Sequence, residues 1–89
     1  MRRPREGVLN RRGTMMIASM IVEIEADTEA MVLPVLNRIA GVSTYGIKDR
    51  QIVTVVEGET MTAVSDIVRE ISLLNRIVGV YPVFAGEHV

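Results

Sequence analysis

A repeated segment constrains the fold of this chain more than any other feature of its sequence. Residues 36–42 read LNRIAGV and residues 74–80 read LNRIVGV, so six of seven positions are identical at an offset of 38. Upstream, residues 22–28 can be aligned with residues 56–62 at an offset of 34, and the difference of four residues is about one helical turn. We therefore expect two copies of a strand–helix–strand unit.

The first unit follows the periods of a strand and a helix. Residues 16–24 alternate, with an entirely apolar even-numbered face, as in a half-buried strand. Asp27 or Thr28 can cap the helix that follows, in which Pro34 indicates either a late start or a kink. Gly41 is expected to end this helix. The predicted apolar stripe of the helix consists of Val32, Val35, Leu36 and Ile39.

A hairpin joins the first unit to the second. Residues 42–47 and the β-branched run at residues 51–57 are expected to be strands, with the hairpin turn at residues 48–50. A second helix is expected to start at Thr60 or Thr62. Its predicted apolar stripe consists of Val64, Ile67, Val68, Ile71 and Leu74.

The last segment completes a known topology. Gly79 is expected to end the second helix, and residues 80–85 form the final strand. Two βαβ units joined by a hairpin give an α+β, ferredoxin-like βαββαβ fold. Its four-stranded antiparallel sheet has the spatial order 4-1-3-2, with both helices on one face. Pro82 fits this order, because strand 4 is an edge strand, where a missing backbone donor is tolerated.

Two helices on one side leave the other face of the sheet to solvent. By parity, the residues predicted to face outward are Ile17, Ser19, Ile21, Glu23, Gln51, Val53, Val55 and Glu57. The centre of this set is aliphatic. Because the two strands are antiparallel, Glu23 and Glu57 are expected near opposite ends of the sheet. An exposed apolar patch with a polar rim is typical of a partner-binding surface, and these eight residues are the predicted binding site.

Charge is divided unevenly along the chain. The net charge of −1 combines a net of +4 over residues 1–14 with a net of −5 over residues 15–89. We therefore expect a basic, flexible tail at residues 1–14 and an acidic domain at residues 15–89. An acidic domain argues against nucleic-acid binding. The expected partner is a short, basic, partly apolar peptide.

The sequence lacks the residues that several classes of protein function require. The 89 residues contain no cysteine, no glycine-rich phosphate loop, no Ser/His/Asp constellation and no clustered metal ligands, and the sole histidine is His88. We expect no enzyme activity, metal or cofactor. The longest apolar stretch, residues 15–22, is too short to span a bilayer, and acidic residues follow it where a signal-peptide cleavage site would lie. A cytoplasmic protein without membrane insertion is predicted, and an edge strand makes a homodimer possible.

Four segments resemble one protein family in their order and spacing. They are residues 19–22 (SMIV), 36–42 (LNRIAGV), 51–57 (QIVTVVE) and 79–84 (GVYPVF), and the resemblance to NapD-type proteins covers about residues 16–87. These are chaperones that assist maturation of periplasmic nitrate reductase. The resemblance implies binding of the twin-arginine signal peptide of a molybdoenzyme precursor, as a helix on the outward-facing sheet surface. Such binding would delay export until the cofactor is inserted.

Part of this expectation also follows from the residues themselves. A twin-arginine peptide offers two guanidinium groups followed by an apolar segment, and arginine pairs bidentately with carboxylates such as Glu23 or Glu57.

The alternative from another functional class is a regulatory domain of the ACT type, which shares the fold and binds a small molecule such as an amino acid at a dimer interface.

Overall fold

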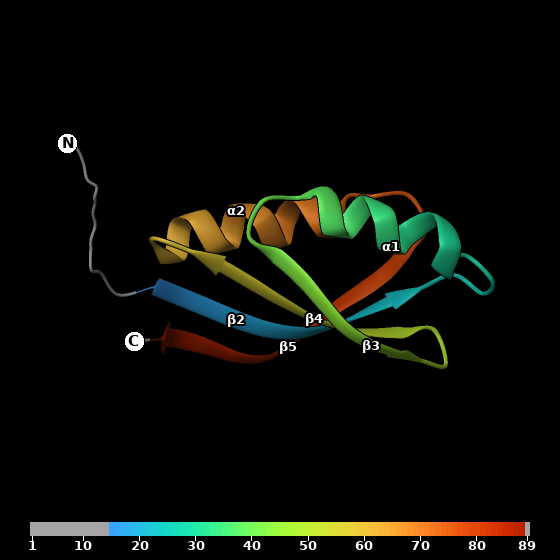
Figure 1. The fold of residues 1–89 in the computed structure, drawn as a ribbon, viewed down its shortest axis with the longest axis horizontal. Coiled ribbons are helices and arrows are strands. Elements are labelled where there is room, and N and C mark those ends of the chain that lie inside the picture. The colour runs from blue at the N-terminus through green and yellow to red at the C-terminus, as the bar shows by residue number, and fades with distance from the viewer. Residues whose placement is uncertain (1–14, 89) are drawn as a thin grey trace.

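The fold is a single antiparallel sheet with two helices, in a computed structural model that describes residues 15–88 (Figure 1). Its elements in chain order are β2 (Met15–Ile24), α1 (Glu29–Arg38), β3 (Val42–Lys48), β4 (Gln51–Gly58), α2 (Met61–Ser72) and β5 (Ile77–His88). The spatial order of the strands is β3-β4-β2-β5, and each neighbouring pair is antiparallel. The predicted ferredoxin-like topology is therefore confirmed, with Pro82 on the edge strand β5.

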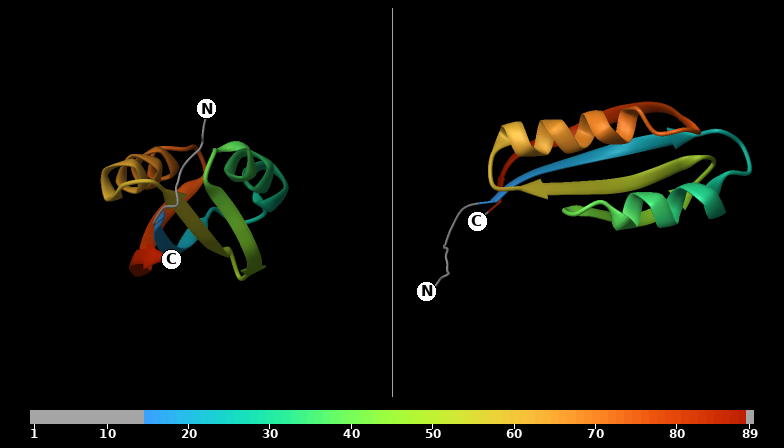
Figure 2. Two further views of the ribbon diagram at one scale, coloured as in Figure 1. Left: turned by 60° about the vertical axis from the view of Figure 1, so that its left-hand side comes forward. Right: turned by 90° about the horizontal axis from the view of Figure 1, so that it is seen from above.

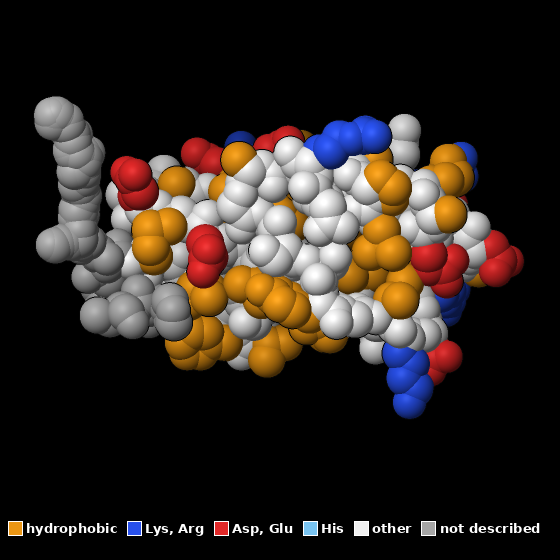
Figure 3. Space-filling model, in the orientation of Figure 1, with side chains coloured by type: hydrophobic (Ala, Val, Ile, Leu, Met, Phe, Trp, Pro, Cys, Tyr) orange, Lys and Arg blue, Asp and Glu red, His pale blue; other side chains and the backbone are white. Residues whose placement is uncertain are grey.

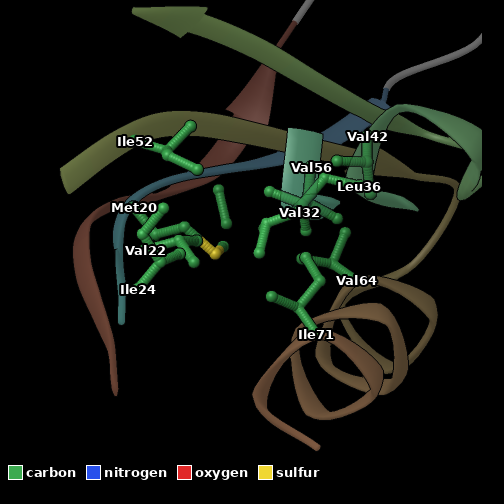
Figure 4. Close-up of a cluster of buried hydrophobic side chains, with 11 residues drawn as sticks. Met20, Val22, Ile24, Val32, Leu36, Val42, Ile52, Val56, Val64 and Ile71 are labelled. Carbon is green, nitrogen blue, oxygen red and sulfur yellow. The ribbon is translucent and has the colours of Figure 1, made fainter. Parts of the chain in front are cut away.

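Both helices lie on the same face of the sheet, as the end-on view in Figure 2 shows. The core fills the space between the two layers (Figure 4). From β2 it takes the even-numbered residues, as predicted, and from β4 it takes Ile52, Thr54 and Val56, all fully buried. The Thr54 hydroxyl donates a hydrogen bond to the Ile52 carbonyl at 3.2 Å, so the buried polar group of this strand is satisfied.

The two helices start and pack differently. In α2, the Thr60 hydroxyl accepts a hydrogen bond from the Ala63 N–H at 3.0 Å, which confirms one of the two predicted starts. In α1, Pro34 lies inside the helix, so a late start is wrong. The predicted stripe of α1 is confirmed for Val32, Leu36 and Ile39, which are buried or pack against the core, but Val35 is exposed. Leu33, which the prediction left out, packs against the core, so α1 faces the sheet with a stripe turned toward Leu33.

The two copies of the repeated segment adopt different structures. In the first copy, Leu36 to Arg38 are helical and Gly41 has a φ of +87°, in the turn that leads into β3. In the second copy, α2 has already ended at Ser72, and Arg76 takes the left-handed conformation with a φ of +77°. The prediction that Gly79 ends the second helix is therefore wrong, since Gly79 lies within β5. The same Leu-Asn-Arg sequence therefore ends a helix at residues 36–38 and forms a turn at residues 74–76.

Within residues 15–88, neither helix is long and apolar enough to cross a membrane. The tail predicted at residues 1–14 lies outside the described residues, as does Val89.

Candidate functional site

The sheet surface turned away from the helices, called the open face below, consists of four cross-strand rows defined by the strand register. The first two rows are Glu57, Ile17 and Gly86, and then Ser43, Val55, Ser19 and Phe84. The third and fourth rows are Gly46, Val53, Ile21 and Tyr81, and then Lys48, Gln51, Glu23 and Gly79. Uncharged residues fill the two middle rows, and the ionisable carboxylate and ammonium groups stand in the outer ones.

All eight sequence-predicted residues lie on this face. The parity of β4 is as predicted, because its alternate residues Ile52, Thr54 and Val56 are buried beneath the helices. Glu57 is in the first row and Glu23 in the fourth, so the two carboxylates stand at opposite ends of the face, as expected. Whether these residues bind a peptide stays a prediction.

The sequence interpretation missed two aromatic residues of the open face, Tyr81 and Phe84. They are 51% and 54% exposed, and they flank the two middle rows from the edge strand β5. Strict alternation would place residues 81 and 83 on one face. A register shift between Ser19 and Met20 instead leaves Val83 as the extra residue of a bulge, so that Phe84 pairs with Ser19 on the open face. The sequence signal that could have identified them as functional residues is that both are aromatic.

Tyr81 forms a hydrogen bond with Glu23, one of the two carboxylates of the open face. Its hydroxyl donates a hydrogen bond to Glu23 Oε1 at 3.2 Å. This hydrogen bond and the negative charge of Glu23 raise the pKa of Tyr81 above its ordinary value. The ring lies along its own strand over Gly79, where an added Cβ would approach the hydroxyl oxygen to 2.5 Å. Glu23 is thus partly covered and already has a donor.

A shallow hollow marks the hairpin side of the open face. Its volume is about 310 Å³, and it is lined by Ile21, Gly46, Ile47, Lys48, Gln51 and Val53. Figure 3 shows hydrophobic side chains gathered along the lower side of the molecule, where β2 and β5 run, and basic side chains protruding at the β3–β4 hairpin. The open face therefore joins an apolar middle to ends of different charge.

A second hollow, of about 390 Å³, lies on the helix side of the sheet between α2 and β5. Its lining includes Met61, Val68 and Pro82 and contains no charged residue. It can accept apolar groups but offers no ion-pair partner to a cation. Among residues 15–88, no three histidine, aspartate or glutamate side chains stand close enough together to hold a metal ion.

The arrangement on the open face suits recognition of an amphipathic segment. Apolar side chains from three strands provide a surface on which an apolar stripe can be buried, and carboxylates at its ends can pair with cations. The face spans six residue steps of β2, from Ile17 to Glu23, which is about 20 Å at ~3.4 Å per residue. A helix of about 13 residues covers that length at ~1.5 Å per residue.

Comparison with known proteins gives a consistent identification. The family model described as NapD protein matches residues 15–87. The solution structure of the Tat proofreading chaperone protein NapD from E. coli is similar to this chain, with a TM-score of 0.75 and 16% sequence identity. The similarity covers 83% of this chain and 80% of that one, which at this identity is evidence for a shared fold. No curated protein matches the sequence.

Proposed function

This chain belongs to the NapD family, and from that premise we propose that it is a maturation chaperone rather than an enzyme. In this proposal it binds the twin-arginine signal peptide of a molybdoenzyme precursor, of the periplasmic nitrate reductase type. Binding takes place in the cytoplasm on the open face, and it delays export until the cofactor has been inserted.

The observation that carries the proposal is the composition of the open face. It is the sheet surface that no other element of the described chain covers, and it combines exposed apolar side chains with carboxylates. A twin-arginine peptide has the complementary composition, with two guanidinium groups beside an apolar segment. The similar E. coli structure is that of a Tat proofreading chaperone, which supports a peptide of this class as the ligand.

Burial of the apolar segment would supply most of the affinity. An apolar side chain transferred from water into an interface contributes roughly 1.5–3 kcal/mol. Ile21 and Val53, which face one another across β2 and β4, and Tyr81 beside them provide such contacts in one row. Three contacts of this size amount to roughly 4–9 kcal/mol before the cost of ordering the peptide, whereas micromolar binding requires about 8 kcal/mol net, so the arginine–carboxylate pairs and the other apolar residues of the open face must add to them.

A titration of the full chain with a synthetic twin-arginine signal peptide tests the proposal. We expect a dissociation constant at or below about 10 µM, and weaker binding of a variant with two lysines, since lysine lacks the bidentate geometry of arginine. The same chain should be screened for thermal stabilisation by amino acids. Stabilisation by an amino acid without any binding of the peptide would contradict the proposal and favour the ACT-type alternative.

A further inference from the structure

We propose that the signal peptide binds the open face in one direction, with its arginine pair over the Glu57 end and its apolar segment running parallel to β2 toward the β3–β4 hairpin. This inference rests on the proposed function and adds the orientation of the ligand and the residues that set it. Three electrostatic features of the face, and an aromatic ring beside them, favour the same direction.

The first feature is the charge of the two outer rows. The first row, Glu57, Ile17 and Gly86, contains a carboxylate and no basic residue. The fourth row contains Glu23, but it also contains Lys48 on the edge strand β3, with Gln51 between them. An arginine pair placed over the fourth row would stand near a like charge, whereas the described side chains of the first row offer it only the opposite charge. Coulomb attraction and repulsion therefore both favour the Glu57 end.

The second feature is the state of the two carboxylates. Glu23 is half-buried and accepts a hydrogen bond from Tyr81, so an arginine would have to displace this hydroxyl to form a bidentate pair. Glu57 is exposed, and no hydrogen bond or ion pair joins its carboxylate to another residue of the range 15–86, over which the structure describes the side chains. No residue of that range therefore competes with a guanidinium group for the two carboxylate oxygens of Glu57.

An aromatic ring extends this end of the face. Phe84 belongs to the second row, and its ring leans over Gly86 of the first row, where an added Cβ would lie 3.2 Å from its Cζ. Gly86 and Glu57 flank Ile17 on either side. One guanidinium group can therefore pair with Glu57 while the other stacks on the exposed ring of Phe84.

The third feature is the dipole of the bound helix. A helix carries partial positive charge at its N-terminus and partial negative charge at its C-terminus. With the arginines at the N-terminal end, the peptide's N-terminus lies near Glu57 and its C-terminus lies near Lys48, so both dipole ends meet the opposite charge. The apolar segment that follows the arginines then reaches the hollow at Ile21 and Val53. In the reverse orientation the peptide's N-terminus lies near Lys48 and its C-terminus lies near Glu57, so each dipole end lies near a like charge.

Paired charge-removing substitutions test the direction. Glu57→Gln is expected to weaken binding of the twin-arginine peptide by about tenfold, as expected for loss of a charged hydrogen-bond partner. Glu23→Gln, at the other end of the open face, is the comparison: it keeps an acceptor oxygen for Tyr81 and should weaken binding less than Glu57→Gln does, by under about threefold. The opposite ranking of the two variants would overturn the proposed direction.

Spin labels on the peptide give a readout that does not depend on the variants. A nitroxide beside the arginines should broaden the backbone amide signals of Ile17 and Gly86, and a nitroxide at the other end should broaden those of Glu23 and Lys48. Exchanged patterns, or equal broadening from both labels, would overturn the direction while leaving the proposed function intact. If the unmodified chain binds no peptide at all, the proposed function itself fails, and the two failures are thereby distinguished.

Discussion

Replacing two adjacent residues of β2 with aspartate separates recognition from folding. Ile21 lies on the open face and is partly exposed, whereas Val22 points into the core and has no exposed surface. Ile21→Asp is expected to weaken peptide binding and leave the fold intact. Val22→Asp is expected to unfold the domain. The two positions belong to the same strand and differ by one residue, so strand propensity is closely matched between them.

The magnitudes follow from burial. Val22→Asp loses about 1.5 kcal/mol of apolar burial or more and places a polar group in the core at a further cost of roughly 2–7 kcal/mol. At about 0.05–0.15 kcal/mol per residue, a chain of this size is stable by only roughly 4–13 kcal/mol. Ile21→Asp should reduce stability by no more than about 1 kcal/mol, since it exposes the carboxylate to water. Loss of one apolar contact of ~1.5–3 kcal/mol weakens binding by about 10-fold to 150-fold.

Urea unfolding followed by circular dichroism measures the stability of both variants, and fluorescence anisotropy of a labelled peptide measures binding. Unfolding of the Ile21→Asp variant would refute the assignment of the two sheet faces. An Ile21→Asp variant that is folded and binds with the affinity of the unmodified chain would show that the peptide lies elsewhere, for example in the hollow between α2 and β5.

Three further outcomes are expected. Gly41→Ala should lower the free energy of unfolding in urea by at least about 2 kcal/mol, because φ at Gly41 is +87° and the new Cβ would lie 2.5 Å from the Glu57 carbonyl oxygen. Gly46→Ala is the control, because no atom lies within 4 Å of the Cβ it would add, and it should not destabilise the fold. Equal losses of stability in the two variants would contradict this reasoning. In an absorbance titration, Tyr81 should ionise at higher pH than a free tyrosine. The stabilisation from its hydrogen bond is therefore present below the ordinary tyrosine pKa and is lost as pH rises through the raised value. Glu23→Gln should lower the pKa of Tyr81, and an unchanged titration in that variant would count against the contact. Deleting residues 1–14, which lie outside the described residues, should tighten peptide binding if the Arg11-Arg12 pair competes for the open face, whereas unchanged affinity would discard that idea.

The sequence predicted the layers of this fold well because hydrophobic alternation reports directly which face of a strand is buried. Met20 and its even-numbered neighbours in β2 are in the core, and the assignment of Val53 and Val55 to the open face holds. The exact ends of the elements were predicted less well. Six of the seven positions of the repeat are identical, so the repeat itself does not distinguish its two copies, yet Arg38 is helical and Arg76 takes a left-handed conformation.

The aromatic part of the open face could not be read from the sequence for a related reason. A bulge adds one residue to β5 without any change in the alternation of apolar residues around it. Counting from Tyr81 therefore assigns Val83 to the open face and Phe84 to the helix side. The register between β2 and β5 determines on which face Phe84 lies. Because this register depends on both strands, it cannot be read from the residues of β5 alone.

The bulge also links the edge strand to the direction proposed for the ligand. Without the extra residue, Phe84 would stand opposite Ala18 under the helices, and the first row would have no aromatic neighbour. With it, Phe84 leans toward the Glu57 end and Tyr81 toward the Glu23 end, so each carboxylate row has one ring beside it. Only Tyr81 carries a hydroxyl, and that hydroxyl is bonded to its carboxylate. The difference between a phenol and a phenyl ring thus leaves one end of an otherwise similar surface more available to a cationic partner than the other.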